Sequence, residues 1–154
     1  MQVLIPAAGM GKRLGLETAN KTKAMVKVHG KALIERCLDA VVKHEIDRII
    51  LVVGYEADKL KSFIGNKYKG VDIIYVENTI FDSTNNIYSV FLARDYLVED
   101  DTILIESNLI FDPEILSTLI KNPSKNIALV EKYKTWMDGT VVKLNSDFSI
   151  SHFI

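Results

Sequence analysis

Two glycines and two cations follow the first apolar run of the chain, in the stretch AAGMGKRL, residues 7–14. Gly9 and Gly11 allow a main chain to pass close to a phosphate and to offer it N–H groups, because glycine has no side chain to obstruct the approach. Lys12 and Arg13 add positive charge, and the fork of the Arg13 guanidinium suits phosphate oxygens. The stretch therefore indicates a loop that binds the phosphates of a nucleotide. A tight turn without a ligand is the alternative interpretation, because glycine-rich turns are common.

Two familiar phosphate-binding patterns do not fit this loop. The Walker pattern G-x-x-x-x-G-K-[ST] fails because Leu14-Gly15-Leu16 stands where its Gly-Lys-Ser/Thr is required. The dinucleotide fingerprint G-x-G-x-x-G fails because Leu14 takes the place of its third glycine. The loop is therefore of a third kind, and an NAD-dependent oxidoreductase is disfavoured.

The elements that must position the loop alternate between strands and helices. Short apolar runs indicate strands at Val3–Ile5, Arg48–Val53, Val71–Val76, Thr102–Glu106 and Asn126–Glu131. Apolar residues at helical spacing indicate helices over residues 33–44, 56–64, 85–97 and 113–120. A late antiparallel pair is indicated at Thr140–Leu144 and Ser149–Ile154. This order predicts the α/β class, as a three-layer α/β/α Rossmann-like fold with a mostly parallel sheet and its ligand beyond the carboxyl ends of the strands.

Length and composition bound the class of protein. The 154 residues, of which 48% are hydrophobic, suffice for one compact domain with a core. A net charge of −1 provides no basic field, so we expect no nucleic-acid partner. No apolar run is long enough for a membrane span and no signal peptide is recognisable, so we expect no membrane partner and a cytoplasmic location. The single cysteine, Cys37, is expected in the core.

A second segment completes a recognisable pattern. Residues 20–26 read NKTKAMV and residues 30–35 read GKALIE. Together with residues 4–14, they resemble the signature of the nucleotidyltransferase (NTP-transferase) family, L-x-A-A-G-x-G-x-R-L, then P-K-A, then G-K-P-L-I-E. Thr22 and Ala32 replace the two prolines of that signature. The resemblance implies a fold like that of GT-A enzymes.

The resemblance also implies a reaction and a site. A phosphate or sugar-phosphate oxygen attacks the α-phosphorus of a nucleoside triphosphate and releases pyrophosphate, with the assistance of magnesium (Mg2+). Arg13 would neutralise the leaving pyrophosphate, and Lys23 would contact the α-phosphate and the attacking phosphate. Such catalysis depends on positioning and charge neutralisation. The residues that would hold the base and the phosphates are Ala7, Ala8, Gly9, Gly11 and Lys12.

Residues 83–90, STNNIYSV, are similar to the base-side motif of the branch that includes phosphocholine and 2-aminoethylphosphonate cytidylyltransferases. The similarity implies that Asn85, Asn86 and Ser89 pair with a pyrimidine edge or its ribose, and it favours CTP as the nucleotide. The alternative is that Ser83, Thr84 and Asn85 cap the following helix.

Residues 106–111, ESNLIF, resemble a stretch of this branch, E-S-D-L-I-F, whose aspartate binds magnesium. Asn108 stands in the place of that aspartate, and a neutral amide is a poor substitute for a carboxylate facing a hard cation. We therefore expect weak metal binding at Asn108. Because side chains alternate along a strand, Glu106 is expected to face the same way as Asn108, and Ser107 the opposite way.

Trp136 and Asp138 provide the expected contacts to the acceptor. Trp136 can receive an ammonium group by cation–π attraction, and Asp138 can receive it by charge. A similar aromatic-plus-acid stretch occurs in the related cytidylyltransferases. The alternative is that Trp136 packs against a turn made by Asp138-Gly139.

These observations favour a magnesium-dependent nucleotidyltransferase that transfers CMP from CTP to a small phosphate or phosphonate, such as phosphocholine or 2-aminoethylphosphonate. Residues 1–154 are expected to form the N-terminal portion of a longer catalytic domain, because the chain stops inside an expected strand. A sugar-1-phosphate acceptor stays open, as does a nucleotide-binding regulatory module without turnover, which Asn108 favours. The sequence also leaves open whether the chain forms a homodimer.

Overall fold

The computed structural model describes residues 1–137 and 139–154 and divides them into two compact units, Met1–Lys121 and Asn122–Ile154. Asp138 lies outside the described residues.

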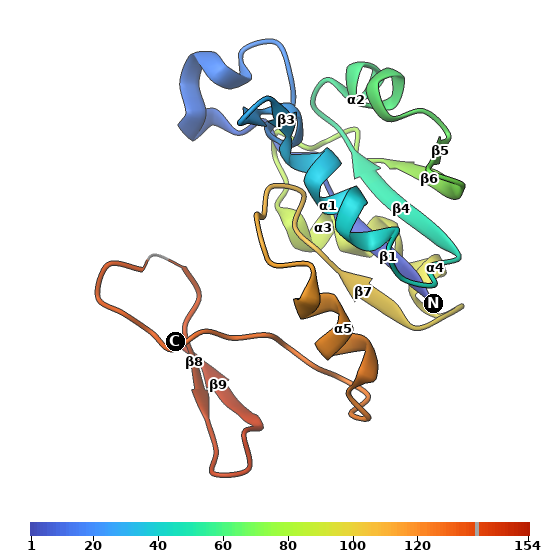
Figure 1. The fold of residues 1–154 in the computed structure, drawn as a ribbon. Helices are drawn as coiled ribbons and strands as arrows, with labels where there is room; N and C mark the ends of the chain where they lie inside the picture. Colours follow the sequence, from blue (N-terminus) through green and yellow to red (C-terminus); the bar gives the residue numbers. More distant parts are fainter. Residues whose placement is uncertain (138) are drawn as a thin grey trace. The chain divides into compact units, whose positions relative to one another are not determined.

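The first unit is built on a five-stranded sheet in the order β5-β6-β4-β1-β7 (Figure 1). The strands β1, β4, β6 and β7 are parallel, and the short β5 pairs antiparallel with β6. Their bounds are β1 Gln2–Pro6, β4 Arg48–Val53, β5 Lys67–Tyr68, β6 Val71–Glu77 and β7 Thr102–Leu104. Both central strands, β1 and β4, are continuous apolar runs with almost every residue buried, as expected for parallel strands covered on two faces.

Helices cover both faces of this sheet. Their bounds are α1 Leu33–Val41, α2 Ala57–Ile64, α3 Asn86–Leu92, α4 Arg94–Leu97 and α5 Glu114–Lys121. Two short 3-10 helices, η1 Lys12–Thr18 and η2 Lys23–Met25, follow β1 and precede a small hairpin of β2 Lys27–Val28 and β3 Lys31–Ala32.

The alternation of side chains along β1 creates two cores. Val3 and Ile5 belong to a core that includes buried residues of α1, α2 and α5. Leu4, which points to the opposite face, packs in a second core with Ala93, at the junction of α3 and α4. The unit therefore has the α/β/α layers expected from the sequence.

Helix α1 begins and packs as its sequence predicts. The backbone N–H of Ala32 donates to Glu35 Oε2 at 2.8 Å, which satisfies one of the free donors at the helix N-terminus. Cys37 on its apolar face is fully buried, as expected, and burial raises the pKa of its thiol to about 12. Such a thiol is not a nucleophile at neutral pH.

The second unit contains the antiparallel pair expected from the sequence, β8 Val142–Leu144 and β9 Ile150–Phe153. The prediction of a strand at Asn126–Glu131 is wrong. All residues of that segment are exposed and it joins none of the sheets in the described part of the chain. An apolar run becomes a strand only where a neighbouring backbone and a covering layer accept it.

No helix among the described residues combines the length and apolar character that crossing a bilayer demands.

Candidate functional site

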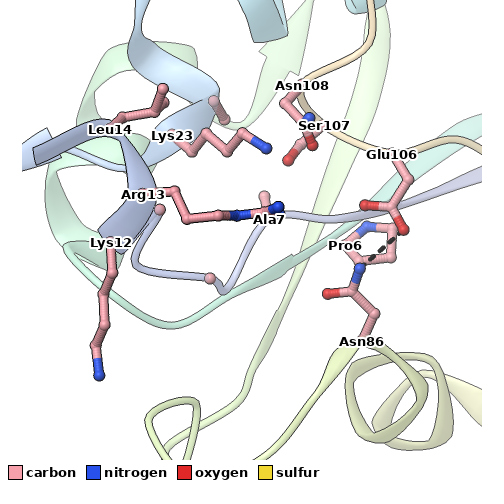
Figure 2. Close-up of a pocket in the computed structure, with 13 residues that line it drawn as sticks. Pro6, Ala7, Lys12, Arg13, Leu14, Lys23, Asn86, Glu106, Ser107 and Asn108 are labelled. Atoms are coloured by element: carbon pink, nitrogen blue, oxygen red, sulfur yellow. Dashed lines mark hydrogen bonds between the residues drawn. The ribbon is translucent and has the colours of Figure 1, made fainter. Parts of the chain in front are cut away.

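A cavity of about 590 Å³ lies beyond the carboxyl ends of β1 and β7 in the first unit. Its walls come from the loop after β1, from η2, from the turn after β7, and from the first residue of α3 (Figure 2). The lining residues are Pro6, Ala7, Gly9, Gly11, Lys12, Arg13, Leu14, Lys23, Ala24, Asn86, Glu106, Ser107 and Asn108. The cavity lies where a ligand is expected on a parallel sheet.

Gly11 determines how the loop approaches Lys23. Its φ of 64° lies in the left-handed region, and a Cβ at this position would be 3.0 Å from Lys23 Cβ and 3.1 Å from Thr18 Cγ2. The Thr18 hydroxyl donates to the Gly11 carbonyl at 3.1 Å, and the Leu14 N–H donates to the same oxygen at 2.9 Å. The loop thus folds onto itself, which brings η1 and η2 together.

The cations of the loop point in different directions. Figure 2 shows Lys23 extending toward Ser107 and Arg13 extending toward Ala7, whereas Lys12 extends in another direction. Arg13, Lys23 and Lys12 all line the cavity. Within the described part of the chain, neither Arg13 nor Lys23 forms an ion pair with an acid. Two uncompensated cations on one wall make the cavity suited to an anion.

Ala8 is a positioning residue rather than part of the cavity wall. It is buried, and its carbonyl accepts the Tyr55 N–H at 3.0 Å. Gly54 makes this approach possible, because a Cβ on Gly54 would lie 2.9 Å from Ala8 Cβ. The Tyr55 hydroxyl also donates to the carbonyl of Ala19 at 2.8 Å, so the turn between β4 and α2 holds the segment that follows η1. The sequence analysis missed Gly54 and Tyr55; their only signal was their place directly after a buried strand.

The expected base-side residues separate in the structure. Asn86 lines the cavity and donates to Glu106 Oε1 at 2.9 Å (Figure 2). Asn85 is exposed, occupies the N-cap position of α3 without a side-chain capping bond, and does not line the cavity. Ser89 is buried, and its hydroxyl accepts a hydrogen bond from Asn78 Nδ2 at 3.3 Å. Of these three residues, the structure brings only Asn86 into the cavity wall.

Asn78, which the sequence analysis did not single out, organises this segment. It follows β6 directly and is buried. Its Nδ2 also donates to the Thr84 hydroxyl at 3.0 Å, and its Oδ1 accepts the Ile80 N–H at 3.1 Å. The hydroxyls of Ser83 and Thr84 both donate hydrogen bonds to the Ile80 carbonyl. They therefore close a turn before α3 instead of capping the helix.

The turn after β7 differs from the expected strand. Strand β7 ends at Leu104, and Ser107 and Asn108 form a turn. The expectation that Ser107 faces away from Glu106 and Asn108 is therefore wrong, since all three line the cavity (Figure 2). Alternation applies only while the chain stays pleated, and here the sheet ends before the polar residues begin.

The described residues contain no group of three or more His, Cys, Asp and Glu side chains arranged for a metal ion. Glu106 is the only carboxylate among the described residues that line the cavity, and Asn108 lines the same cavity. One carboxylate with neutral oxygen ligands fits a magnesium ion that is bound mainly by substrate phosphates, and it does not form a closed protein cage.

Trp136 belongs to the second unit. Its side chain is 74% exposed, and Lys134 Nζ lies 5.8 Å from the ring centroid. The ring therefore already faces a cation of its own chain. Its expected partner, Asp138, lies outside the described residues.

The mostly parallel sheet and the cavity beyond its carboxyl ends are those of an α/β protein that binds a ligand. The chain belongs to the family of the MobA-like NTP transferase domain, whose model matches residues 3–136. The family expected from residues 4–35 is therefore confirmed.

Similar proteins include two that act on phosphonates. The CMP-5'-(3-aminopropyl)phosphonate synthase of Streptomyces rubellomurinus is 29% identical over 154 residues, which are 100% of this chain and 24% of that protein. The 2-aminoethylphosphonate cytidylyltransferase of Lancefieldella rimae is 33% identical over 111 residues, which are 72% of this chain and 44% of that protein. The chain thus spans less than half the length of these relatives.

Among solved structures, the inositol-1-phosphate CTP transferase from T. maritima matches with a TM-score of 0.75 and 25% identity. The match covers 99% of this chain and 62% of that one. The predicted α/β fold with a mostly parallel sheet is confirmed.

Proposed function

We propose that this chain binds CTP and transfers CMP to a small phosphate or phosphonate acceptor, with release of pyrophosphate. The observation that carries this proposal is that Arg13 and Lys23, both without an acidic partner in the described part of the chain, share one cavity wall with a glycine loop. The class of the acceptor is supported by the names of the similar proteins, both of which act on aminoalkyl phosphonates.

Arg13 and Lys23 divide the negative charge of the triphosphate between them. Arg13 follows Lys12 after the glycine loop, and we assign to it the terminal phosphates, whose charge increases as pyrophosphate leaves. Lys23 packs against Gly11 of that loop, and we assign to it the α-phosphate and the incoming acceptor; the shared cavity supports both assignments. Cations fixed in position before the reaction stabilise the developing charge without reorganisation, and removing one such group typically costs about 10²–10³ in rate.

Magnesium is the cofactor we propose, held by Glu106 and Asn108 together with phosphate oxygens of the substrate. When bound, it would neutralise phosphate charge during the displacement. Asn86 assists by donating to Glu106 Oε1, which fixes the orientation of that carboxylate. Asn86 is also the residue best placed to contact the base or ribose, whereas Ser89 and Asn85 would act by shaping α3 and its N-terminus. Trp136 and Asp138 are proposed to receive the amino group of the acceptor.

A thermal-shift panel tests the nucleotide. The chain is mixed with CTP, UTP, GTP or ATP, each with and without magnesium. A ligand present at 100 times its dissociation constant stabilises the folded state by about 2.7 kcal/mol, so the preferred base should stand out. We expect the largest shift with CTP and magnesium, and its loss in Arg13→Ala and Lys23→Ala. A larger shift with UTP, or no shift with any nucleotide, contradicts the proposal.

Pyrophosphate release tests turnover separately. The chain is incubated with CTP and with 2-aminoethylphosphonate, phosphocholine or a sugar 1-phosphate. Release with an amino-bearing acceptor supports the proposed reaction, and release only with the sugar phosphate replaces the acceptor. CTP binding without release under all these conditions indicates a nucleotide-binding module.

A further inference from the structure

A second cavity, of about 540 Å³, lies in the first unit between α1 and the segment Leu109–Pro113. It shares no lining residue with the nucleotide cavity. Its polar lining is dominated by cations, since Asp39 is the one acid among the described lining residues and accompanies Lys31, Arg36, Lys43 and Lys69. In a chain with a net charge of −1, this is a local excess of positive charge.

Asp39 is already paired with side chains of the protein. Asp39 pairs with Lys31, with Lys69 Nζ at 2.7 Å, and with the Tyr68 hydroxyl at 2.9 Å. Partial burial opposes ionisation of Asp39, but the hydrogen bonds from Lys31, Lys69 and Tyr68 outweigh it and hold the pKa of the carboxyl well below its usual range. One carboxylate faces two ammonium groups, so this part of the wall remains positive.

Arg36 contributes donors that the protein itself does not use. Its Nη2 donates to the carbonyl of Val28 at 2.5 Å, which fixes the guanidinium against the β2–β3 hairpin. Its Nε is buried and has no hydrogen-bond partner in the described part of the chain. A buried N–H without an acceptor is destabilising, so this guanidinium retains an unused donor beside the cavity.

Two neighbouring acids, Glu35 and Asp112, lie outside the lining of this cavity. Glu35 Oε2 accepts the Ala32 N–H at 2.8 Å, and Asp112 Oδ1 accepts the Glu114 N–H at 3.0 Å. Lys43, which does line the cavity, is exposed and forms no ion pair in the described part of the chain.

The opposite wall is apolar. It consists of Leu109, Ile110 and Phe111 with Pro113, and the side chains of Leu109 and Ile110 are 44% and 60% exposed. A ligand that touches both walls must combine an anionic group with an apolar group. We propose that this cavity is a second binding site, for a small molecule that carries a phosphate-type dianion next to an apolar or aromatic part.

The proposed site is connected to the nucleotide cavity by one short segment. Glu106, Ser107 and Asn108 line the first cavity, and the residues that follow them line the second. A ligand in the second cavity would therefore contact the segment that positions Asn108, and its binding should be detectable there as well.

The test uses phenylphosphonate as the probe, with inorganic phosphate and benzyl alcohol as partial probes. Backbone amide signals of the 15N-labelled chain are followed during titration. We expect saturable shifts at residues 36–43 and 107–111, with phenylphosphonate binding more tightly than phosphate, and no shifts with benzyl alcohol. Lys43→Glu should weaken phenylphosphonate binding about tenfold, because it reverses one charge at the wall. Lys125→Glu, an equal charge change at an exposed site of the second unit, should leave it unchanged.

Binding in the nucleotide cavity is distinguished by Arg13→Ala. Shifts at residues 36–43 that persist in Arg13→Ala and weaken in Lys43→Glu support the second site. Three outcomes overturn the proposal. The shifts are confined to residues 9–13 and 23, or Lys43→Glu and Lys125→Glu weaken phenylphosphonate binding equally, or the titration with phenylphosphonate does not saturate. None of these outcomes depends on whether the chain turns over CTP.

Discussion

The backbone of Gly11 lies against the side chain of Lys23, so closely that a Cβ on Gly11 would be 3.0 Å from Lys23 Cβ. The absence of a side chain at Gly11 therefore does more than expose an N–H to phosphate. It allows the first loop and the helix η2 to meet, and this contact places Arg13 and Lys23 on one wall.

Gly11→Ala tests this contact. The substitution combines a positive φ with a Cβ that meets two side chains, so we expect a loss of about 2–3 kcal/mol in the free energy of unfolding. We also expect CTP affinity to fall at least tenfold, measured by calorimetry. Gly9→Ala is the matched control, because a Cβ there meets no atom within 4 Å. Gly9→Ala should fold normally. It should weaken CTP binding only because the added methyl group hinders the close approach of the backbone to the phosphates. Equal stability of the two variants contradicts the role assigned to Gly11.

Asn108→Asp should strengthen metal-dependent binding. A second carboxylate beside Glu106 gives magnesium a harder ligand and more negative charge. The expected result is tighter CTP binding in the presence of magnesium and slightly weaker binding without it, because the new charge repels the triphosphate. Calorimetric titrations with and without magnesium measure both effects. Asn108→Ala should reduce the gain in CTP affinity that magnesium produces. If that gain stays the same in Asn108→Ala, Asn108 is not a magnesium ligand.

Thr22→Pro should stabilise the segment that carries Lys23. Thr22 is buried, and its hydroxyl has no hydrogen-bond partner among the residues that the structure describes. Its φ of −67° and ψ of 156° are values that proline adopts without strain. We expect a gain of about 1 kcal/mol in urea unfolding, from reduced freedom of the unfolded chain and removal of the unsatisfied hydroxyl. Thr22→Val removes the hydroxyl alone and should give a smaller gain. Destabilisation by both variants would show that the hydroxyl is satisfied.

Asp39→Asn should destabilise the chain in a pH-dependent way. The pKa of Asp39 is lowered in the folded state, so its charge contributes stability above the unfolded pKa of about 3.9, and this contribution is lost as the pH falls through the folded pKa. From pH 5 to 7, the free energy of unfolding of the wild type should be about 1–2 kcal/mol higher than that of Asp39→Asn. The difference should shrink below about pH 4. A gap that is constant from pH 7 to pH 3 would contradict the ionic role of Asp39.

Much of the fold could be predicted because β1 and β4 are apolar after their first residues, Gln2 and Arg48. The predicted bounds of the strand 48–53 agree with β4, and the helix predicted at 56–64 begins one residue later, as α2. The run Asn126–Glu131 looked equally strand-like, yet it is exposed and unpaired. Apolar character indicates that a segment can be a strand, but pairing depends on which backbone lies beside it, and a single run does not contain that information.

The site was predictable where chemistry and spacing coincide along the chain, and less so where distant residues meet. Arg13 and Lys23 were identified from the motif and do share a cavity. The contribution of Gly54 could not be predicted, because its role is to leave space for Ala8, a residue far away in sequence. Asn78 was missed for a different reason: its partners Thr84 and Ser89 are near in sequence, but only the turn before α3, which no motif indicated, brings them to it.

Strand β1 pairs with β4 on one side and β7 on the other, so Gln2 lies opposite Arg48 and Thr102 in the sheet. A synthetic peptide of residues 1–35 would contain the entire recognisable motif and neither of these neighbours. In water such a peptide has nothing to bury its apolar strand against and stays a random coil, with its two cations no closer than in any flexible chain. The pocket therefore exists only once residues about a hundred positions apart in the sequence, such as Gln2 and Thr102, have paired.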